Sequence, residues 1–423
     1  MRILTFGWDY PPLRNGGLGV ACHGLTEELI NAGAEVIFVL PRVQPVIGKS
    51  TFRFATGNGG GANVKGVRKY DERFRVIEVG DIQLVPYRSG STPVMYKLPD
   101  GRTLRLDRSV MREAHRYAME AARIAREETF DIIHAHDWTS YLAGLAAHEV
   151  SGKPLILHVH ATSYDQAGGP NVDPDIYAIE CEAFQAADTV LAVSNYTRSL
   201  LIEHYNVPSE KVVVVHNGVY PGKPQELAPT LKSYKEQGVK VVAYHGRVTI
   251  QKGIVQLVRS ARLVVDHFPN VVFVIAGEGD MLNEIVRTVG AYGLSKHFIF
   301  AYALWDEERD RLFQSADLLV MPSVSEPFGI VPLEAMQHGT PVIVSKQSGA
   351  SEVLTHALKV DFWDTEEMAN KIVAVLRHPA LYEQLVREGQ KEVEHITWGK
   401  AAKKVIEVYR RLLEWFQRRG TIS

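Results

Sequence analysis

The sequence predicts an α/β protein made of two doubly wound domains that face each other across a central cleft. Short apolar, β-branched segments alternate with helix-length segments along most of the 423 residues. Such alternation is typical of parallel sheets covered by helices. A proline-rich stretch from Tyr220 to Pro229 interrupts it near the middle and indicates a linker. Ligands of doubly wound sheets bind at the carboxyl ends of strands, so we expect the site in the cleft.

The elements follow from this alternation in chain order. We expect first-half strands at Ile3–Phe6, Glu35–Leu40, Asp131–Ala135, Pro154–Val159, Thr189–Val193 and Val212–His216. We expect second-half strands at Val239–Tyr244, Val271–Ala276, Phe298–Ala301, Leu318–Met321 and Pro341–Ser345. Helices are expected at Leu18–Asn31, Arg108–Glu128, Ile254–Asp266 and Met281–Thr288.

Domain boundaries follow from the same pattern. The first Rossmann-like domain is expected over residues 1–220, the linker over 221–238 and the second Rossmann-like domain over 239–396. Residues 397–423 should form an amphipathic helix that packs back across the domains, with its aromatic side chains in the core. The segment from Thr51 to Leu106 contains short runs such as Phe74–Val79, and we interpret it as an antiparallel excursion.

Composition limits the class of partner. Apolar residues make up 46% of the chain, charged residues 23%, and the formal net charge is −2. These values indicate a soluble globular protein with no basic field for nucleic acid. The two cysteines, Cys22 and Cys181, are too few for a disulfide framework and indicate a reducing compartment. We expect a cytoplasmic protein without a transmembrane segment, and peripheral membrane contact stays open.

A cationic cluster follows the first strand of the second domain. The strand ends before Gly246 and Arg247, and Lys252 follows five residues after Arg247, just before an expected helix. Two cations at the carboxyl end of a strand suit a phosphate group, although a solvated turn would carry the same residues.

A second cluster surrounds two glutamates separated by seven residues. Glu326 follows a buried strand on a loop, and Glu334 is expected in the first turn of a helix that contains Pro332. The free N–H groups of that helix favour a phosphate, and carboxylates suit the hydroxyls of a sugar or ribose. Glu334 could instead only complement the helix dipole. The intervening loop carries four further donor-binding candidates, which are Phe328, Gly329, Ile330 and Val331.

Together the two clusters resemble the donor site of retaining glycosyltransferases with the GT-B fold. In that superfamily two glutamates with this spacing are preceded by an arginine and a lysine arranged as Arg247 and Lys252 are here. The resemblance implies a nucleotide diphosphate sugar as the donor, with Arg247, Lys252 and Glu326 as catalytic residues and Gly246 and Glu334 as donor-binding residues. It implies no cofactor and no metal ion.

The first domain narrows the resemblance. Arg14, Gly16 and Gly17 follow the first strand and open a helix, which is the setting of a phosphate-binding loop. They are similar to the glycine loop of glycogen and starch synthases, which usually begins with lysine. The run from His136 and Asp137 to Trp138 is also similar to these synthases, although Asp137 would equally cap the next helix.

Two further candidates lie at strand ends of the first domain. His158 and His160 share one face of a strand, so a metal pair with Asp165 as third ligand has to be weighed. The resemblance instead makes His160 the active-site histidine that contacts the transferred sugar. Asn217 is an acceptor-side candidate together with His136 and Asp137. The family often has an acidic residue where this chain has Tyr220.

The preferred function is transfer of a hexose, with glucose favoured, from ADP- or UDP-glucose to an α-glucan with retention of configuration. Within the same superfamily, a sucrose- or sucrose-phosphate-type synthase and a lipid or polysaccharide hexosyltransferase are alternatives. A nucleotide-sugar epimerase and an inactive nucleotide-sugar-binding module are further ones. Residues near Gly277–Gly279 and Ala301–Tyr302 are candidates for the nucleobase.

Overall fold

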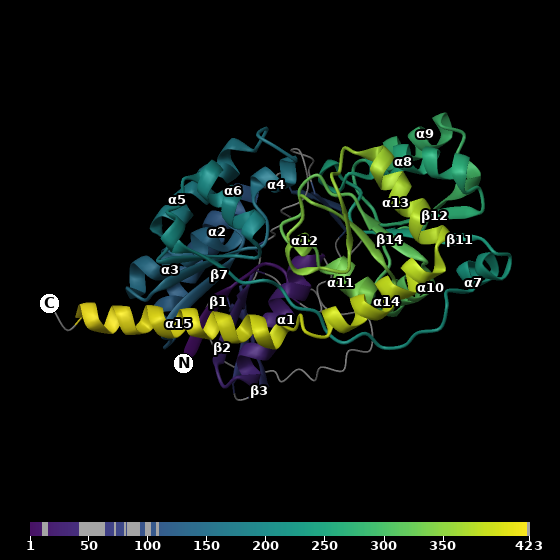
Figure 1. Ribbon diagram of the computed structural model, residues 1–423. Helices are drawn as coiled ribbons and strands as arrows, with labels where there is room; N and C mark the ends of the chain where they lie inside the picture. Colours follow the sequence, from purple (N-terminus) through teal and green to yellow (C-terminus); the bar gives the residue numbers. More distant parts are fainter. Residues whose placement is uncertain are drawn as a thin grey trace.

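A computed structural model describes residues 1–10, 16–41, 64–71, 73–79, 82, 94–97, 103–106 and 110–420. Its two α/β domains lie side by side, and the C-terminal helix returns along the first domain (Figure 1). The predicted fold class is therefore confirmed. The central strands of both sheets are buried along nearly their whole length, which is why their sequences are largely apolar runs.

The first domain contains an eight-stranded sheet with the order β10-β9-β8-β7-β1-β2-β4-β3. Its strands are β1 (Arg2–Phe6), β2 (Glu35–Leu40), β3 (Val64–Asp71), β4 (Phe74–Val79), β7 (Ile132–His136), β8 (Leu155–Val159), β9 (Thr189–Ala192) and β10 (Val212–Val214). Its helices are α1 (Gly17–Asn31), α2 (Val110–Glu127), α3 (Trp138–Ser151), α4 (Ser163–Ala167), α5 (Pro174–Ala186) and α6 (Asn195–Tyr205). Strands β5 (Val94–Lys97) and β6 (Thr103–Leu106) form a separate hairpin.

One expectation for this domain was wrong in part. Strand β4 does not belong to an antiparallel excursion, because it joins the main sheet parallel to β2. Among the described strands of this segment, β3 pairs antiparallel with β4, and β5 pairs antiparallel with β6. The apolar alternation of β4 fits either neighbour, and only the assembled sheet decides the direction.

The second domain contains a six-stranded parallel sheet with the order β13-β12-β11-β14-β15-β16. Its strands are β11 (Lys240–His245), β12 (Val271–Ala276), β13 (Phe298–Phe300), β14 (Leu318–Met321), β15 (Val342–Ser345) and β16 (Leu358–Val360). Its helices are α8 (Ile254–His267), α9 (Leu282–Ala291), α10 (Asp306–Ser315), α11 (Ile330–Gln337), α12 (Ala350–Val353), α13 (Thr365–Arg377) and α14 (Pro379–Val393). A helix that the sequence did not predict, α7 (Pro229–Glu236), lies in the connection between the domains.

The order in which strands are added reverses near the centre of each sheet. Strand β11 lies between β12 and β14, and β1 lies between β7 and β2, so the chain adds strands on one side of β11 or β1 first and then on the other side. Such a switch point leaves a crevice outside the carboxyl ends of the strands. One predicted donor cluster follows β11 and the other follows β14, and His136 is the last residue of β7.

The C-terminal helix α15 (Trp398–Gly420) packs against α1. Gly24 allows this contact, because a Cβ there would lie 2.4 Å from the buried Trp398 side chain. Tyr409 is fully buried and its hydroxyl lies 2.6 Å from Nδ1 of His134. Trp415 differs from the expectation that the aromatics of this helix are core residues, since it is 43% exposed. Among the described helices, none combines the length and apolarity that crossing a membrane requires.

Candidate active site

The domains meet through polar groups that flank the predicted site. The hydroxyl of Ser325 donates to Oδ1 of Asp165 at 2.5 Å, and that of Ser194 donates to the carbonyl of Pro327 at 2.6 Å. Helix α4 lies against the 3-10 turn η2 (Ile250–Lys252). The segment that follows β8 therefore touches the segment that follows β11, and both border the loop after β14.

The turn after β11 depends on glycines that permit close backbone approach. Gly246 has a φ of +147°, and a Cβ at Gly277 would lie only 1.8 Å from the carbonyl oxygen of Gly246. The buried Tyr244 fixes the turn by donating its hydroxyl to the carbonyl of Arg247 at 2.6 Å. The loop from Gly277 to Gly279 therefore packs directly on the turn that carries Arg247.

Lys252 and Glu326 form the centre of the predicted donor cluster. Nζ of Lys252 lies 2.6 Å from Oε2 of Glu326, and the hydroxyl of Ser323 donates to the same oxygen at 3.0 Å. The side chains of Lys252 and Glu326 are 13% and 11% exposed. Nη2 of Arg247 lies 3.3 Å from Oε1 of Gln251, whose amide donates to the carbonyl of Ser325. The structure thus brings the predicted Arg247, Lys252 and Glu326 segments together.

Glu334 lies elsewhere than the sequence indicated. Helix α11 begins at Ile330, so Glu334 falls in its second turn and not in the first, where no acidic residue stands. Its carboxylate accepts a hydrogen bond of 2.9 Å from Nη1 of Arg309 on α10. Burial raises the pKa of Glu334, and the charge of Arg309 opposes that rise. The helix dipole therefore does not explain this residue, because the dipole acts within the terminal turn.

The four donor-binding candidates between the glutamates form the entry to α11. Gly329 has a φ of +90°, and a Cβ there would lie 3.0 Å from Cγ of Glu326. Phe328 is 2% exposed, with its ring centroid 6.0 Å from that of His216 in the first domain. Ile330 is buried and Val331 is half-buried. In this stretch the backbone N–H groups at the start of α11 are the groups suited to an anion.

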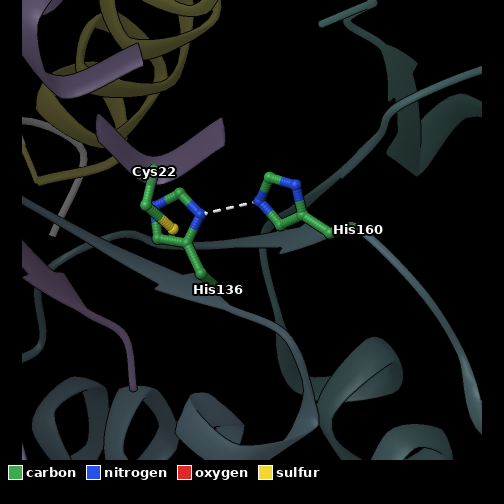
Figure 2. A group of neighbouring side chains, drawn as sticks. All are labelled: Cys22, His136 and His160. Atoms are coloured by element: carbon green, nitrogen blue, oxygen red, sulfur yellow. Dashed lines mark hydrogen bonds between the residues drawn. The ribbon is translucent and has the colours of Figure 1, made fainter. Parts of the chain in front are cut away.

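His136 and His160 lie in direct contact at the ends of β7 and β8. Nδ1 of His136 is 2.9 Å from Nε2 of His160 (Figure 2). Burial lowers the pKa of both imidazoles well below the ordinary value, so both are neutral at neutral pH. A neutral imidazole offers one donor and one acceptor nitrogen, as contact with a sugar hydroxyl requires.

Asp137 fixes the backbone that carries His160. The sequence left a helix-capping role open, but its side chain does not cap α3. Oδ1 instead accepts hydrogen bonds from the backbone N–H of His160 at 2.7 Å and of Ala161 at 3.2 Å. Asp137 also has a φ of +58°, a conformation that costs roughly 1–3 kcal/mol for a non-glycine residue and is concentrated at functional sites. Burial raises its pKa to about 8.

The remaining first-domain candidates are placed as follows. Gly16 precedes α1 with a φ of +134°, and Gly17 is its first residue. Arg14 lies outside the described residues. Asn217 is 7% exposed and follows His216, whose Nε2 lies 3.1 Å from a carboxylate oxygen of Glu352 in the second domain.

The structure also places Tyr220, Asp165 and Arg309. The hydroxyl of Tyr220, at the position where the family often has an acid, hydrogen-bonds to the Glu27 carboxylate of α1. Asp165 accepts hydrogen bonds from Thr162 and Ser325, and it is in neither group of described residues whose ligand atoms lie close enough to share a metal ion. Arg309 was missed in the sequence because a lone arginine in a charged helix gives no signal.

The comparisons with known proteins agree with the fold. The family described as glycosyl transferases group 1 matches residues 231–392, and glycosyltransferase family 4 matches residues 15–223. An uncharacterized glycosyltransferase of Methanocaldococcus jannaschii is 28% identical over 99% of this chain and 100% of its own. Glycogen synthase of Mycobacterium tuberculosis is 24% identical over 97% of this chain and 94% of its own.

A third relative, the alpha-maltose-1-phosphate synthase of Mycolicibacterium smegmatis, is 30% identical over 67% of this chain and 80% of its own. Among solved structures, sucrose-phosphate synthase of Thermosynechococcus elongatus superimposes with a TM-score of 0.74 at 20% identity, covering 98% of this chain and 99% of its own. Starch synthase IV of Arabidopsis thaliana, bound to ADP and acarbose, gives 0.70 at 17% identity, covering 97% and 99%. The chain belongs to the group 1 glycosyltransferases with the GT-B fold.

Proposed function

We propose that this glycosyltransferase moves a hexose, with glucose favoured, from a nucleotide diphosphate sugar to an α-glucan with retention of configuration. The observation that carries the proposal is the Lys252–Glu326 pair at the switch point of the second sheet, bordered by the segment that follows His160. Cations beside a helix N-terminus suit a diphosphate, and carboxylates suit sugar hydroxyls.

The cations account for the leaving group. When the bond between the anomeric carbon and the phosphate oxygen breaks, about one negative charge is added to the diphosphate. A cation at about 4 Å contributes about 4 kcal/mol at an effective dielectric constant near 20. Arg247, Lys252 and the N-terminus of α11 supply this stabilisation in our proposal, so the reaction needs no metal ion. Activity that EDTA abolishes would contradict that part.

Retention is assigned to attack from the face that the leaving group occupies. Oε2 of Glu326 already accepts from Lys252 and Ser323, which makes this carboxylate a poor covalent nucleophile. In the step we favour, the acceptor hydroxyl forms the new bond while its proton passes to the departing phosphate oxygen. His160 contacts the sugar, and Glu334 binds the ribose.

The acceptor is inferred from the relatives. Glycogen synthase is among the full-length relatives, and starch synthase IV carries ADP and acarbose in its structure. These names support ADP-glucose as the donor and a glucan as the acceptor. The structural similarity to sucrose-phosphate synthase supports a sugar phosphate as the second candidate acceptor. A cytoplasmic location also remains a proposal, supported by two free cysteines.

A donor and acceptor panel tests the proposal. ADP-, UDP- and GDP-sugars are offered with glycogen, maltooligosaccharides or fructose phosphates, and the transferred label is measured. Glucose transfer from ADP- or UDP-glucose to a glucan is the expected result. Transfer to fructose phosphate alone would establish the second candidate, and interconversion of donors without an acceptor would indicate an epimerase.

A further inference from the structure

The first domain contains a cluster of four histidines beside the candidate active site. Alternate residues at the end of one strand share a face, and the adjacent strands β7 and β8 each contribute such a pair. Ring centroids lie 4.3 Å apart within each pair, His134 with His136 and His158 with His160. Between the pairs, the rings of His136 and His158 are 5.3 Å apart.

These imidazoles have more nitrogen atoms than hydrogen-bond partners. Within the described part of the chain, both ring nitrogens of His158 are buried without a hydrogen bond, and so are Nε2 of His134 and Nδ1 of His160. Leaving a buried polar atom unpaired costs roughly 1–3 kcal/mol. Burial also lowers the pKa of His134, His136 and His160 well below the ordinary value. The cluster therefore presents neutral imidazoles, the form that binds a metal ion.

Cys22 of α1 adds a sulfur to one edge of the cluster. Its Sγ, a ring nitrogen of His136 and a ring nitrogen of His160 all lie within 4.8 Å of one another. Figure 2 shows Cys22 over the His136 ring and His160 facing that ring from the neighbouring strand. One thiolate and two imidazoles are ligands that suit zinc-class cations, whereas Mg²⁺ and Ca²⁺ prefer oxygen.

We propose that Cys22, His136 and His160 form a binding site for a divalent cation of the zinc class. Bond lengths of about 2.0–2.3 Å in a tetrahedral site place ligand atoms about 3.3–3.8 Å apart, and the three candidate atoms already lie within 4.8 Å of one another. Binding releases one proton from the Cys22 thiol. The proton now shared by His136 and His160 moves to a ring nitrogen that does not bind, and the fourth position remains for water.

Access favours this set over His134, His136 and His158, which also lie within reach of one ion. His160 is half-buried, whereas all three members of the alternative set are fully buried, so the set with Cys22 contains the one residue of these that solvent reaches.

Occupation of this site has a consequence for catalysis that rests on the proposed function. A cation bound to His160 removes the nitrogen lone pair that would contact the transferred sugar. Zinc-class cations then inhibit transfer reversibly, and a chelator restores the rate. This inhibition is compatible with a donor reaction that needs no metal, because the ion blocks a residue of the site and supplies no chemistry to it.

Cobalt titration of the full chain, first stripped with a chelator and without substrate, tests binding directly. The expected result is a sulfur-to-cobalt charge-transfer band together with the visible bands of a tetrahedral ion. Cys22→Ser should remove the charge-transfer band and weaken binding at least tenfold. Cys181→Ser is the matched control, since the half-buried Cys181 lies on α5, and it should keep both. A band that persists in Cys22→Ser overturns the assignment.

X-ray absorption of the zinc-loaded wild-type protein makes the test independent of whether Cys22→Ser folds. One sulfur with two imidazole nitrogens is expected around zinc, and a shell without sulfur overturns the site. Transfer rates with zinc and with EDTA are then compared. Zinc that binds with this shell and leaves the rate unchanged contradicts the block at His160. A protein with the cobalt band but no transferase activity instead contradicts only the proposed function.

Discussion

Lys252 and Glu326 form a largely buried ion pair in which Nζ lies 2.6 Å from Oε2. The pair joins the turn after β11 to the loop after β14 across the switch point of the second sheet. A cation and a carboxylate are therefore already fixed in position in the donor cluster. Such preorganisation is worth more than the same charges would be in water, because they need not reorient during the reaction.

Replacing Lys252 should lower turnover strongly. Lys252→Ala removes a cation from the leaving diphosphate and leaves the Glu326 carboxylate with the Ser323 hydroxyl. We expect kcat to fall roughly 10²–10³-fold, the loss typical of one preorganised electrostatic group. The matched control is Lys346→Ala, which removes an ion pair with Asp361 elsewhere in the domain. A loss below about threefold in Lys252→Ala would refute the assigned role.

Arg309 should act as a positioning residue for Glu334. Because Nη1 of Arg309 donates to the buried carboxylate, Arg309→Ala leaves that carboxylate without its cation and weakens its hold on ribose. The donor KM should rise about tenfold, equivalent to about 1.4 kcal/mol, with kcat changed much less. Arg309→Lys should restore part of the affinity. A fall in kcat as large as the rise in KM, without rescue by lysine, would indicate a merely structural role.

Glu352 should hold the domains together. Its carboxylate accepts from the backbone N–H groups of Asn195 at 2.8 Å and Tyr196 at 2.6 Å, and it lies 3.1 Å from Nε2 of His216. Glu352→Ala removes these contacts and should increase the radius of gyration measured by small-angle X-ray scattering. Glu388→Ala, whose ion pairs lie within α14, should not. An unchanged radius in Glu352→Ala would contradict the role.

Stability should fall in acid partly through His245. Burial lowers the pKa of this histidine from 6.5 to about 4. As pH falls, the His245 imidazole therefore takes up a proton in the unfolded chain before it does so in the folded protein. The contribution of His245 to stability is lost as pH falls from 6.5 through 4. At pH 5 the loss is about 2 kcal/mol. Between pH 7 and 5, the free energy of unfolding measured in urea should fall by about 2 kcal/mol less in His245→Phe than in the wild-type protein. The exposed His115→Phe should behave like wild type.

The strands and the donor cluster could be predicted because each is encoded locally. Buried parallel strands are continuous apolar runs, and Arg247, Lys252 and Glu326 follow two of them in fixed order. The direction of β4 could not be predicted, since its pattern suits either neighbour. Glu334 lies in the second turn of α11 and not in the predicted first turn, because the helix begins at Ile330, before the start that the position of Pro332 suggests.

Contacts between segments that are distant in the sequence could not be predicted, for a different reason. Arg309 reaches Glu334 from another helix, and neither residue's neighbours encode that contact. The His134–His136 and His158–His160 pairs are visible separately, but only the order of the strands in the sheet makes β7 and β8 neighbours. Cys22 joins them because α1 packs over this face, a relation that no local pattern expresses.

Proton NMR of the glucan product tests the central claim most directly. The wild-type protein is incubated with an α-linked nucleotide diphosphate glucose and a maltooligosaccharide, and the anomeric proton of the new linkage is observed before it can equilibrate. The account predicts an α-linked product, formed by attack on the face of the departing diphosphate that Arg247 and Lys252 stabilise. A β-linked product would contradict it.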